Sequence, residues 1–540
     1  MKKLLILFGL LIVGTITAQE DALVFFADKE NVADALTNPI TILTQESLDR
    51  KQLHSTPIDE RDVPVNEDYI AVIKNTNGIT VYSKSKWMNS VYVRGSESNI
   101  NSLLDLAFVT EVEYMDKNLN FTGGNGGDSD DKFIIENESS RINYDYGAAA
   151  NQVEMIDVDF LHQQDYNGEG MVVAVLDSGF PTILSNPAFD HINDEGRVID
   201  TYDFVTRQVS PDGSGSHGLR TSSDIAGLDD GNFVGTAPGA SFIYYVTEEG
   251  GAENPVEEAY WLEALERADS LGVDVVNTSL GYQDFDNSNY DYEYADLDGE
   301  TTIGARAGNL AFDKGMLLVT SGGNDGNDGF GFVASPGDSK GVFTVGAVDA
   351  DENYVSFSSF GPTVDGRVKP DVMAQGAVAA VIDESGNVDF NNGTSFSSPI
   401  IAGAVASLWQ SRPAATNVQI MQIVRESAHL FDTPTNEMGY GIPNFQDAYN
   451  ALQLLAFEDV LAATQFGMYP NPAENFVNFS MPQNISSATV SLYTLSGQQL
   501  NTKVLSNVDS QLDISSLATG MYLVTVVSEN NSNSFKIIKK

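Results

Sequence analysis

The chain contains no cysteine among its 540 residues. Disulfide bridges, thiolate metal sites and a cysteine nucleophile are therefore excluded, and the fold depends on packing alone. Positive charge is scarce as well, because 28 lysines and arginines stand against 76 aspartates and glutamates, for a formal net charge of -48. Such a charge repels polyanions, so we expect no binding to nucleic acid or to an anionic membrane surface.

Long apolar runs are also rare, and the N-terminus carries the one that stands out. It extends from Leu4 to Val13, follows a pair of lysines and precedes the small residue Ala18. This pattern is typical of a cleaved secretory signal. Because a membrane-spanning helix needs about 20 apolar residues, we predict a signal peptide over residues 1–18 and no transmembrane anchor.

The segment after the signal has the mixed pattern of a small α+β domain. Strands are predicted over 69–73 and 79–82, joined by Asn77-Gly78, a pair typical of hairpin turns. A short helix over 99–106 and a strand over 109–114 follow. The next residues are rich in glycine and aspartate, so they cannot pack and are predicted to be a flexible linker.

From residue 132 to 455, apolar strands alternate with helix-like stretches, which predicts a parallel sheet with helices on both faces. In such sheets functional residues lie at the carboxyl ends of strands, and Asp177 and Ser279 each end a predicted strand. The predicted strands and helices include 171–176, 241–246, 256–270, 273–279, 302–314, 317–320 and 342–348.

Three polar residues, far apart in the chain, have informative neighbours. Ser395 lies in Gly-Thr-Ser-Phe-Ser-Ser-Pro before an apolar run of small residues, which predicts a tight turn that opens a helix. Unpaired N–H groups at a helix start favour negative charge, including that of an oxyanion. Asp177 ends a buried strand, where an unpaired carboxylate would be unfavourable, and His217 stands in Ser-His-Gly.

A serine hydroxyl is a weak nucleophile until a base takes its proton, and a carboxylate must hold that base in the right tautomer. His217 is the candidate base among five histidines. His54 falls in the N-terminal domain, and His162, His191 and His429 lack comparable neighbours. The chain order Asp, His, Ser is one of three known orders for such a triad.

With these neighbours the chain resembles the subtilisin-like serine proteases (subtilases, peptidase family S8). The resemblance implies that Asp177, His217 and Ser395 are the catalytic residues and that they act through an acyl-enzyme. It further implies that Asn324, which follows the strand and glycine-rich turn 317–323, donates to the oxyanion beside the backbone N–H of Ser395. A compact N-terminal domain on a cleavable tether has the layout of a propeptide, which in subtilases assists folding and blocks the cleft.

The resemblance also places the substrate cleft. Ser279, Leu280 and Gly281 match the strand that pairs with the substrate backbone in subtilases, and such pairing gives affinity through main-chain hydrogen bonds. Small residues are expected to border the main specificity pocket and to leave room for a large apolar or aromatic side chain. These residues are Gly281, Ser321, Gly322 and Gly323.

Two positions depart from the family pattern. Subtilases usually have His-Gly-Thr, whereas here Leu219 replaces the threonine and Arg220 follows, and Ser178 stands after Asp177 in place of the common threonine. Neither change removes a reacting group. Leu219 nevertheless leaves open a second hypothesis, a catalytically inactive subtilase-like binding or adhesion protein. A third hypothesis is a hydrolase of esters or other acyl groups, although the cleft strand favours peptides.

The C-terminal segment consists of short alternating strands, such as 489–493 and 520–526, which predicts an all-β sandwich of about 75 residues. Tyr-Pro-Asn-Pro at 469–472, Leu-Ser-Gly at 495–497 and the terminal Lys-Ile-Ile-Lys-Lys resemble the sorting domains of the type IX secretion system. The resemblance implies export to the outside, or to the outer surface, of a Gram-negative cell. A carbohydrate-binding or spacer sandwich is the alternative.

An acidic segment interrupts the central domain. Its oxygen ligands suit calcium, but it lacks EF-hand spacing, and we interpret it as a solvated loop near the cleft. Structural calcium stays an alternative, the metal ligands are unknown, and the chemistry itself requires no cofactor. The acidic residues lie between 284 and 300 and include Asp284, Asp286, Asp291, Glu293, Asp296 and Asp298.

Together these patterns predict an α/β fold in which helices flank a subtilisin-like parallel sheet, with an N-terminal α+β propeptide domain and a C-terminal all-β sandwich domain. The predicted function is a secreted serine endopeptidase, made as a zymogen, monomeric, and active on protein or peptide substrates. The predicted boundaries are 1–18 for the signal peptide, 19–122 for the propeptide, 123–131 for the linker, 132–455 for the catalytic domain, 456–464 for a second linker and 465–540 for the sorting domain.

Overall fold

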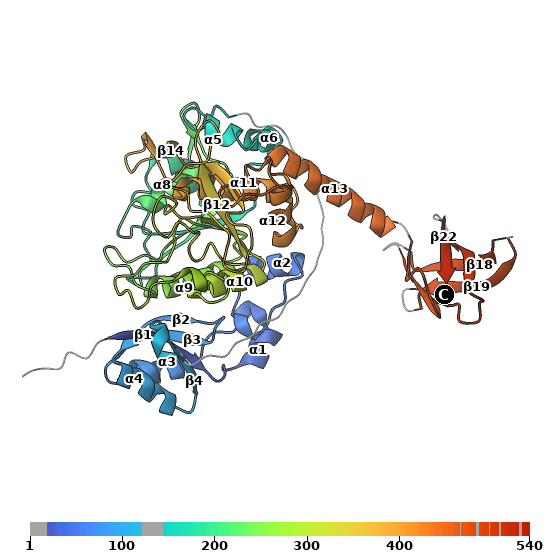
Figure 1. Ribbon diagram of the computed structural model, residues 1–540, viewed down its shortest axis with the longest axis horizontal. Coiled ribbons are helices and arrows are strands. Elements are labelled where there is room, and N and C mark those ends of the chain that lie inside the picture. The colour runs from blue at the N-terminus through green and yellow to red at the C-terminus, as the bar shows by residue number, and fades with distance from the viewer. Residues whose placement is uncertain are drawn as a thin grey trace, which may run out of the picture. The chain divides into compact units, whose positions relative to one another are not determined.

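The computed structural model describes residues 19–120, 144–464, 466–481, 485–495, 497–506, 509–528 and 532–540 (Figure 1). The predicted signal peptide and the glycine- and aspartate-rich linker lie outside the described residues. The chain divides into two compact units, residues 1–449 and 450–540.

The first domain is an antiparallel sheet in the order β2-β3-β1-β4. Alternation along β1 points Ala22 and Val24 into the domain's own core, whereas Leu23 joins the apolar cluster of the central domain. The strands are β1 (Glu20–Phe26), β2 (Ile79–Ser85), β3 (Ser90–Gly95) and β4 (Val109–Tyr114). The helices are α1 (Val32–Thr37), α2 (Gln45–Leu53), α3 (Glu67–Lys74) and α4 (Glu97–Asn101).

Helix α3 replaces the strand predicted over 69–73, and that prediction was wrong. Asn66 caps the helix, because its side-chain oxygen accepts hydrogen bonds from two N–H groups of the first turn at 2.9 and 3.2 Å. Ile70 and Ile73 are the buried side chains, so the apolar run has a helical spacing. The predicted hairpin at 77–78 is therefore a turn from a helix into β2, whereas the helix and the strand predicted after it are found as α4 and β4.

The central domain is built on a parallel sheet in the order β13-β12-β11-β10-β5-β9-β6, as the alternation of strands and helices predicts. Its strands are β5 (Val172–Asp177), β6 (Val198–Asp203), β9 (Ser241–Val246), β10 (Val275–Thr278), β11 (Leu317–Ser321), β12 (Val342–Val348) and β13 (Val372–Gln375). Two short ladders accompany the sheet, β7 (Leu228–Asp229) with β8 (Phe233–Val234) and β14 (Ala379–Ile382) with β15 (Val388–Asn391).

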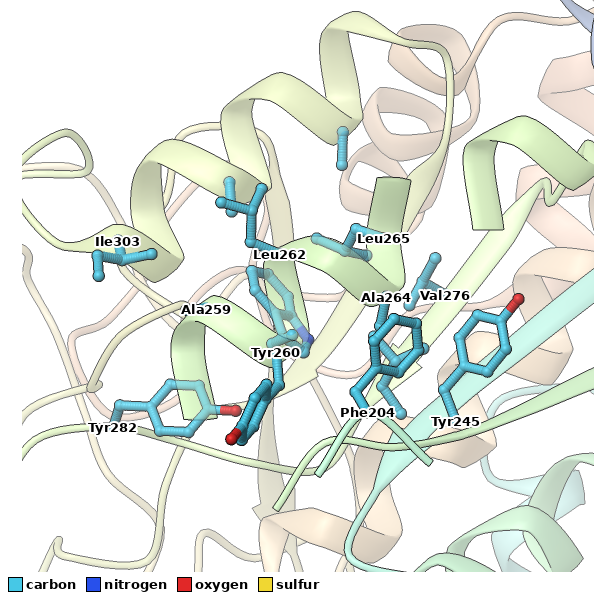
Figure 2. Packing of buried hydrophobic residues seen from close by; sticks show 14 of the residues in the cluster. Phe204, Tyr245, Ala259, Tyr260, Leu262, Ala264, Leu265, Val276, Tyr282 and Ile303 are labelled. Atoms are coloured by element: carbon cyan, nitrogen blue, oxygen red, sulfur yellow. The ribbon is translucent and has the colours of Figure 1, made fainter. Parts of the chain in front are cut away.

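Helices cover both faces of this sheet (Figure 1). On β10, Val276 joins the apolar cluster under α9 and α10, while Asn277 accepts a hydrogen bond at 2.9 Å from Ser398 of α11. Figure 2 shows the α9 side of that cluster, with Leu262 and Leu265 among its members. The helices are α5 (Ala150–Glu154), α6 (Val158–Gln163), α7 (Asp190–Asp194), α8 (His217–Ala226), α9 (Val256–Leu271), α10 (Ile303–Asp313), α11 (Thr394–Gln410), α12 (Asn417–Glu426) and α13 (Phe445–Thr464).

The N-terminal domain docks on helix α9 (Figure 1). The buried carboxylate of Glu266 accepts hydrogen bonds from the Ser85 hydroxyl at 2.6 Å and from the backbone N–H groups of Lys86 and Trp87 at 2.8 and 2.9 Å. Burial raises the pKa of Glu266 to about 7. The turn between β2 and β3 is thus held by a carboxylate that the two domains enclose.

A buried ion cluster extends this contact. Asp269 of α9 pairs with Arg50 at 2.5 Å and with Lys51 at 2.8 Å, and all three side chains are almost fully buried. In the opposite sense, Lys314 of the central domain pairs with Asp62 of the N-terminal domain at 2.8 Å. The lysine and arginine next to Asp269 hold the pKa of its carboxyl below the usual range, despite burial.

The carboxylates of the acidic segment 284–300 are exposed or half-buried, as predicted, but two of its tyrosines are packed. Tyr290 and Tyr292 are buried, and the Tyr290 hydroxyl donates to Glu20 of β1 at 3.1 Å. Lys117 donates to Asp296 and lies over the Tyr292 ring, 4.9 Å from its centroid. The tyrosines supply the apolar surface that a purely acidic loop would lack, so the segment becomes part of the contact with the N-terminal domain.

The C-terminal unit consists of two antiparallel sheets, in the orders β16-β17-β20 and β19-β18-β21-β22, around one apolar core. This is the predicted all-β architecture. Its strands are β16 (Gly467–Tyr469), β17 (Phe476–Ser480), β18 (Ser487–Thr494), β19 (Gln499–Ser506), β20 (Gln511–Asp513), β21 (Gly520–Val527) and β22 (Ser532–Lys539). Helix α13 covers the segment 456–464 that was predicted to be a linker.

We expect Asp269→Ala to weaken the docked state of the N-terminal domain by about 3–5 kcal/mol, because it leaves the buried Arg50 without its counter-charge and Lys51 with Asp62 alone, 3.5 Å away. Urea unfolding of the full chain, in a Ser395→Ala background that removes the predicted nucleophile, measures the change. The matched control is Asp313→Ala, whose carboxylate pairs with Arg61 but is 58% exposed. Equal losses in the two variants would contradict the expectation.

Candidate active site

Asp177 and His217 form the first part of the site. Asp177 ends β5 and is fully buried, and its two carboxylate oxygens lie 2.8 and 2.9 Å from Nδ1 of His217, the first residue of α8. The Ser178 backbone N–H donates to Oδ1 at 2.7 Å and the Thr221 hydroxyl donates to Oδ2 at 3.4 Å. The carboxylate is therefore paired and held in place, as its position at the end of a buried strand predicts.

The Asp177 carboxylate raises the pKa of His217, and this attraction outweighs the burial that would lower it. With Nδ1 donating to the carboxylate, the lone pair of the neutral ring lies on Nε2. Nε2 is then the atom that can accept a proton from a neighbouring hydroxyl.

Ser395 lies at the start of α11, as its flanking sequence predicts. Gly393 precedes the helix at a φ of 146°, a left-handed value that favours glycine. The rings of His217 and Phe396, the residue after Ser395, lie 5.8 Å apart between centroids. Within the described residues the Ser395 hydroxyl donates to the Ser279 carbonyl at 3.4 Å and not to His217. A long or misaligned contact is common before substrate binds.

Two N–H donors, the Asn324 side-chain amide and the Ser395 backbone N–H, lie near Gly393. The backbone N–H and the hydroxyl of Thr394 donate to Oδ1 of Asn324 at 2.9 and 3.1 Å, which fixes the orientation of that amide. A Cβ built on Gly393 would lie 3.6 Å from Asn324 Nδ2 and 3.7 Å from Ser395 N. Glycine therefore leaves open a space that both N–H donors border.

The predicted cleft residues surround the same point. Ser279 follows β10, and its hydroxyl donates to the Ser395 carbonyl at 2.8 Å. Ser321 ends β11, and its hydroxyl donates to the Leu280 carbonyl at 3.4 Å. Nothing lies closer than 3.8 Å to a Cβ built on Gly281. The two strand ends thus lie next to each other, and one of them is open to a ligand.

The turn after β11 closes the other side of this space. The Gly322 backbone N–H donates to the Val345 carbonyl at 2.8 Å, and the Gly323 backbone N–H donates to the Thr394 hydroxyl at 3.1 Å. The glycine-rich turn therefore ties Asn324 to the start of α11, and all the site residues that the sequence predicts lie in one region.

Two contacts of α8 were not predicted from the sequence. Leu219 is fully buried, so the side chain that departs from His-Gly-Thr packs in the core, and Thr221 directs a hydroxyl at Asp177. Arg220 donates to Asp389 at 2.7 Å and to Glu384 at 3.0 Å, which ties α8 to the β14–β15 hairpin. A helix starting at His217 places position 221 one turn later, and that spacing is the signal that could have identified Thr221.

The remaining histidines bond to groups outside the triad. His162 is fully buried between the Tyr146 hydroxyl at 2.7 Å and the Thr236 carbonyl at 3.0 Å, and burial lowers its pKa to about 4. His191 bonds the Pro238 carbonyl at 3.1 Å. In the part of the chain that the structure describes, no cluster of three or more His, Cys, Asp or Glu side chains is placed to hold a metal ion. No helix among the described residues is apolar and long enough to cross a bilayer.

Comparison with protein families agrees with this geometry. Residues 168–441 match the model of the subtilase family, Peptidase S8. The chain belongs to the subtilase family. It is accordingly a serine-type endopeptidase, with a Peptidase S8 propeptide domain of the Bacteroidota type over residues 21–131 and a secretion system C-terminal sorting domain over residues 467–540. The predicted family, fold class, propeptide and sorting domain are confirmed.

Several known proteins are similar to the chain. Serine protease AprX of Bacillus subtilis (strain 168) is 29% identical over 315 residues, which are 53% of this chain and 67% of AprX. Subtilisin Savinase of Lederbergia lenta is 29% identical over 288 residues, 53% of this chain and 93% of Savinase. Among solved structures, MycP1 from Mycobacterium smegmatis is 21% identical, with a TM-score of 0.43 over 59% of this chain and 88% of its own.

We expect Asp177→Asn to lower the pKa of His217 by at least about one pH unit, because the imidazolium then loses its counter-charge while it stays enclosed. NMR titration of the imidazole groups in a Ser395→Ala background measures the pKa. His162 provides an internal reference, since its low pKa arises from burial and should not change. A His217 pKa that stays the same or rises would show that Asp177 is not the group that sets it.

Proposed function

We propose that this subtilase is an active secreted endopeptidase that uses Asp177, His217 and Ser395 as its triad. The observation that carries the proposal is the Asp177–His217 pair, with contacts of 2.8 and 2.9 Å, beside a helix start at which Ser395 and the Asn324 amide meet. A catalytically inactive protein would not require the Asp177 carboxylate, the His217 ring and the two N–H donors to lie together in this arrangement.

In the proposed mechanism, Nε2 of His217 takes the proton from the Ser395 hydroxyl, and Oγ attacks the carbonyl carbon of the scissile peptide. The oxyanion that forms would accept hydrogen bonds from Asn324 Nδ2 and the Ser395 N–H. His217 then gives the proton to the leaving amine, and an acyl-enzyme remains. A water molecule, deprotonated by His217, hydrolyses the acyl-enzyme and restores the serine.

The cleft geometry supports a peptide substrate over a small ester. Ser279–Gly281 directly follows β10, and Gly281 is exposed. Such a segment can pair with the backbone of an extended peptide. An ester without a peptide backbone would not use these groups.

The test compares the full chain with Ser395→Ala and Asn324→Ala. We expect the unmodified chain to release its propeptide, cleave casein and react with a fluorophosphonate probe, and Ser395→Ala to do none of these. Asn324→Ala should keep the reactive serine but lose about 10²–10³ in kcat.

Ser397→Ala is the matched control, since among the described residues that hydroxyl bonds the Thr394 carbonyl of its own helix alone, at 3.0 Å. An unmodified chain that stays full-length and unlabelled would support the binding or adhesion protein. Cleavage of esters without cleavage of casein would support the acyl hydrolase.

We also propose that the C-terminal unit directs export through the type IX secretion machinery to the outside or the outer surface of a Gram-negative cell. Its own apolar core and its separation at residues 449–450 support a unit that acts independently of catalysis. Removal of residues 465–540 should leave casein cleavage intact and leave the enzyme in the periplasm, which fractionation of the native host measures. Normal export of the shortened chain would refute the assignment.

A further inference from the structure

Glu248 lies beside the triad and has no role in the mechanism above. It follows β9, the strand next to β5, and the backbone N–H of the residue before it donates to the Asp177 carbonyl at 3.1 Å. The next turn packs against the segment that leads to His217, because a Cβ on Gly250 would lie 2.6 Å from the Ser214 Cβ. Glu248 is therefore held at the edge of the site, between the carboxylate end of β5 and the loop before α8.

One oxygen of Glu248 is fixed and the other is available. Oε1 accepts hydrogen bonds from the Tyr282 hydroxyl at 2.9 Å and the Thr247 hydroxyl at 2.8 Å. Tyr282 directly follows Gly281, so Glu248 also contacts the end of the cleft strand, and Figure 2 shows this tyrosine at the edge of the apolar cluster. The Glu248 side chain is partly exposed, and among the described residues Oε2 accepts no hydrogen bond.

The charged groups that act most strongly on Glu248 are acidic. Burial, together with repulsion from Asp177 and Glu253, raises the pKa of Glu248 to about 8. Glu248 also contributes to the raised pKa of His217. No lysine or arginine of the described chain forms an ion pair with it, although such pairs are frequent elsewhere in the central domain. A cation supplied from outside would favour the ionised carboxylate and would satisfy Oε2.

We propose that Glu248 selects substrates that carry a lysine or arginine side chain close to the scissile bond. The inference rests on the proposed function, because it assumes that a peptide lies along Ser279–Gly281 and passes His217. A primary ammonium or a guanidinium would donate to Oε2 and form a charge-assisted hydrogen bond, which is stronger than a neutral one. A metal ion is a poorer fit, since the described residues place no group of three ligating side chains at this position.

The experiment compares the enzyme that results from self-processing of the full chain with the same product of its Glu248→Gln variant. Glutamine keeps the shape and can still accept from Tyr282 and Thr247, but it carries no charge. Cleavage sites in a random peptide library, read by mass spectrometry, identify the position and the preferred side chain. Pairs of peptides that differ only in lysine or norleucine at that position then give the ratio of kcat/KM values.

We expect the unmodified enzyme to favour the lysine peptide about tenfold or more, and Glu248→Gln to reduce the ratio to within roughly threefold of one. Glu169→Gln, which removes an exposed carboxylate on the loop before β5, is the matched control and should keep the full ratio. In the unmodified enzyme the ratio should also fall as salt is added, because an ion pair at a partly exposed site is screened. That measurement decides the question if Glu248→Gln fails to fold.

The two proposals fail in different ways. An enzyme that cleaves casein and reacts with the fluorophosphonate, but treats lysine and norleucine peptides alike, overturns the role of Glu248 alone. An unchanged ratio in Glu248→Gln does the same. A chain that neither cleaves nor reacts overturns the proposed function, and the selection of basic substrates falls with it.

Discussion

A buried negative charge on Asp177 is the constraint around which the site is arranged. The carboxylate is fully buried at the end of β5, and it would be strongly unfavourable there without partners. His217, Ser178 and Thr221 supply the donors. Because His217 and Thr221 both come from α8, the pairing of Asp177 fixes where that helix begins and which way it runs. The contact that orients the imidazole is thus also the contact that lets the carboxylate be buried.

Helix α9 connects the central domain to the propeptide, and it too does so through buried carboxylates that accept hydrogen bonds or form ion pairs. Its buried carboxylates, Glu266 and Asp269, contact the N-terminal domain, but they respond to pH in opposite ways. Glu266 has a raised pKa, so docking weakens as pH rises from the usual range of a glutamate carboxyl to about 7, where the buried group ionises. Asp269 has a lowered pKa, so its ion pairs favour docking at neutral pH and are lost only when strong acid protonates it. The hydrogen bonds that Glu266 accepts offset the unfavourable burial of its charge at neutral pH.

The sequence predicts most of the catalytic domain because its signals are local. A buried strand that ends in Asp177, a glycine turn before Ser395 and the alternation of strands with helices each depend on neighbouring residues, and each is found where it was predicted. The strand predicted at 69–73 failed because a capping asparagine and a spacing of three between isoleucines outweighed the β-branched composition. The packing of segment 284–300 could not be predicted, since it depends on Glu20 and Lys117, which lie far away in the chain.

The excess of acid in this protein is not confined to its surface. Glu258 and Glu266 are buried carboxylates with raised pKa values, and the small number of lysines and arginines limits how many such groups can be paired. Where a cation is supplied, it often comes from another part of the molecule, as Arg50 and Lys51 do for Asp269, while Lys314 pairs in the opposite direction with Asp62. Opposite charges that alternate across one interface permit one docked orientation and disfavour its shifted alternatives. Basic side chains of the propeptide therefore neutralise acidic groups of the central domain at α9. A basic substrate would neutralise Glu248 beside the triad in the same way. The excess of acidic residues accounts for both the docking of the propeptide and the proposed selection of substrates.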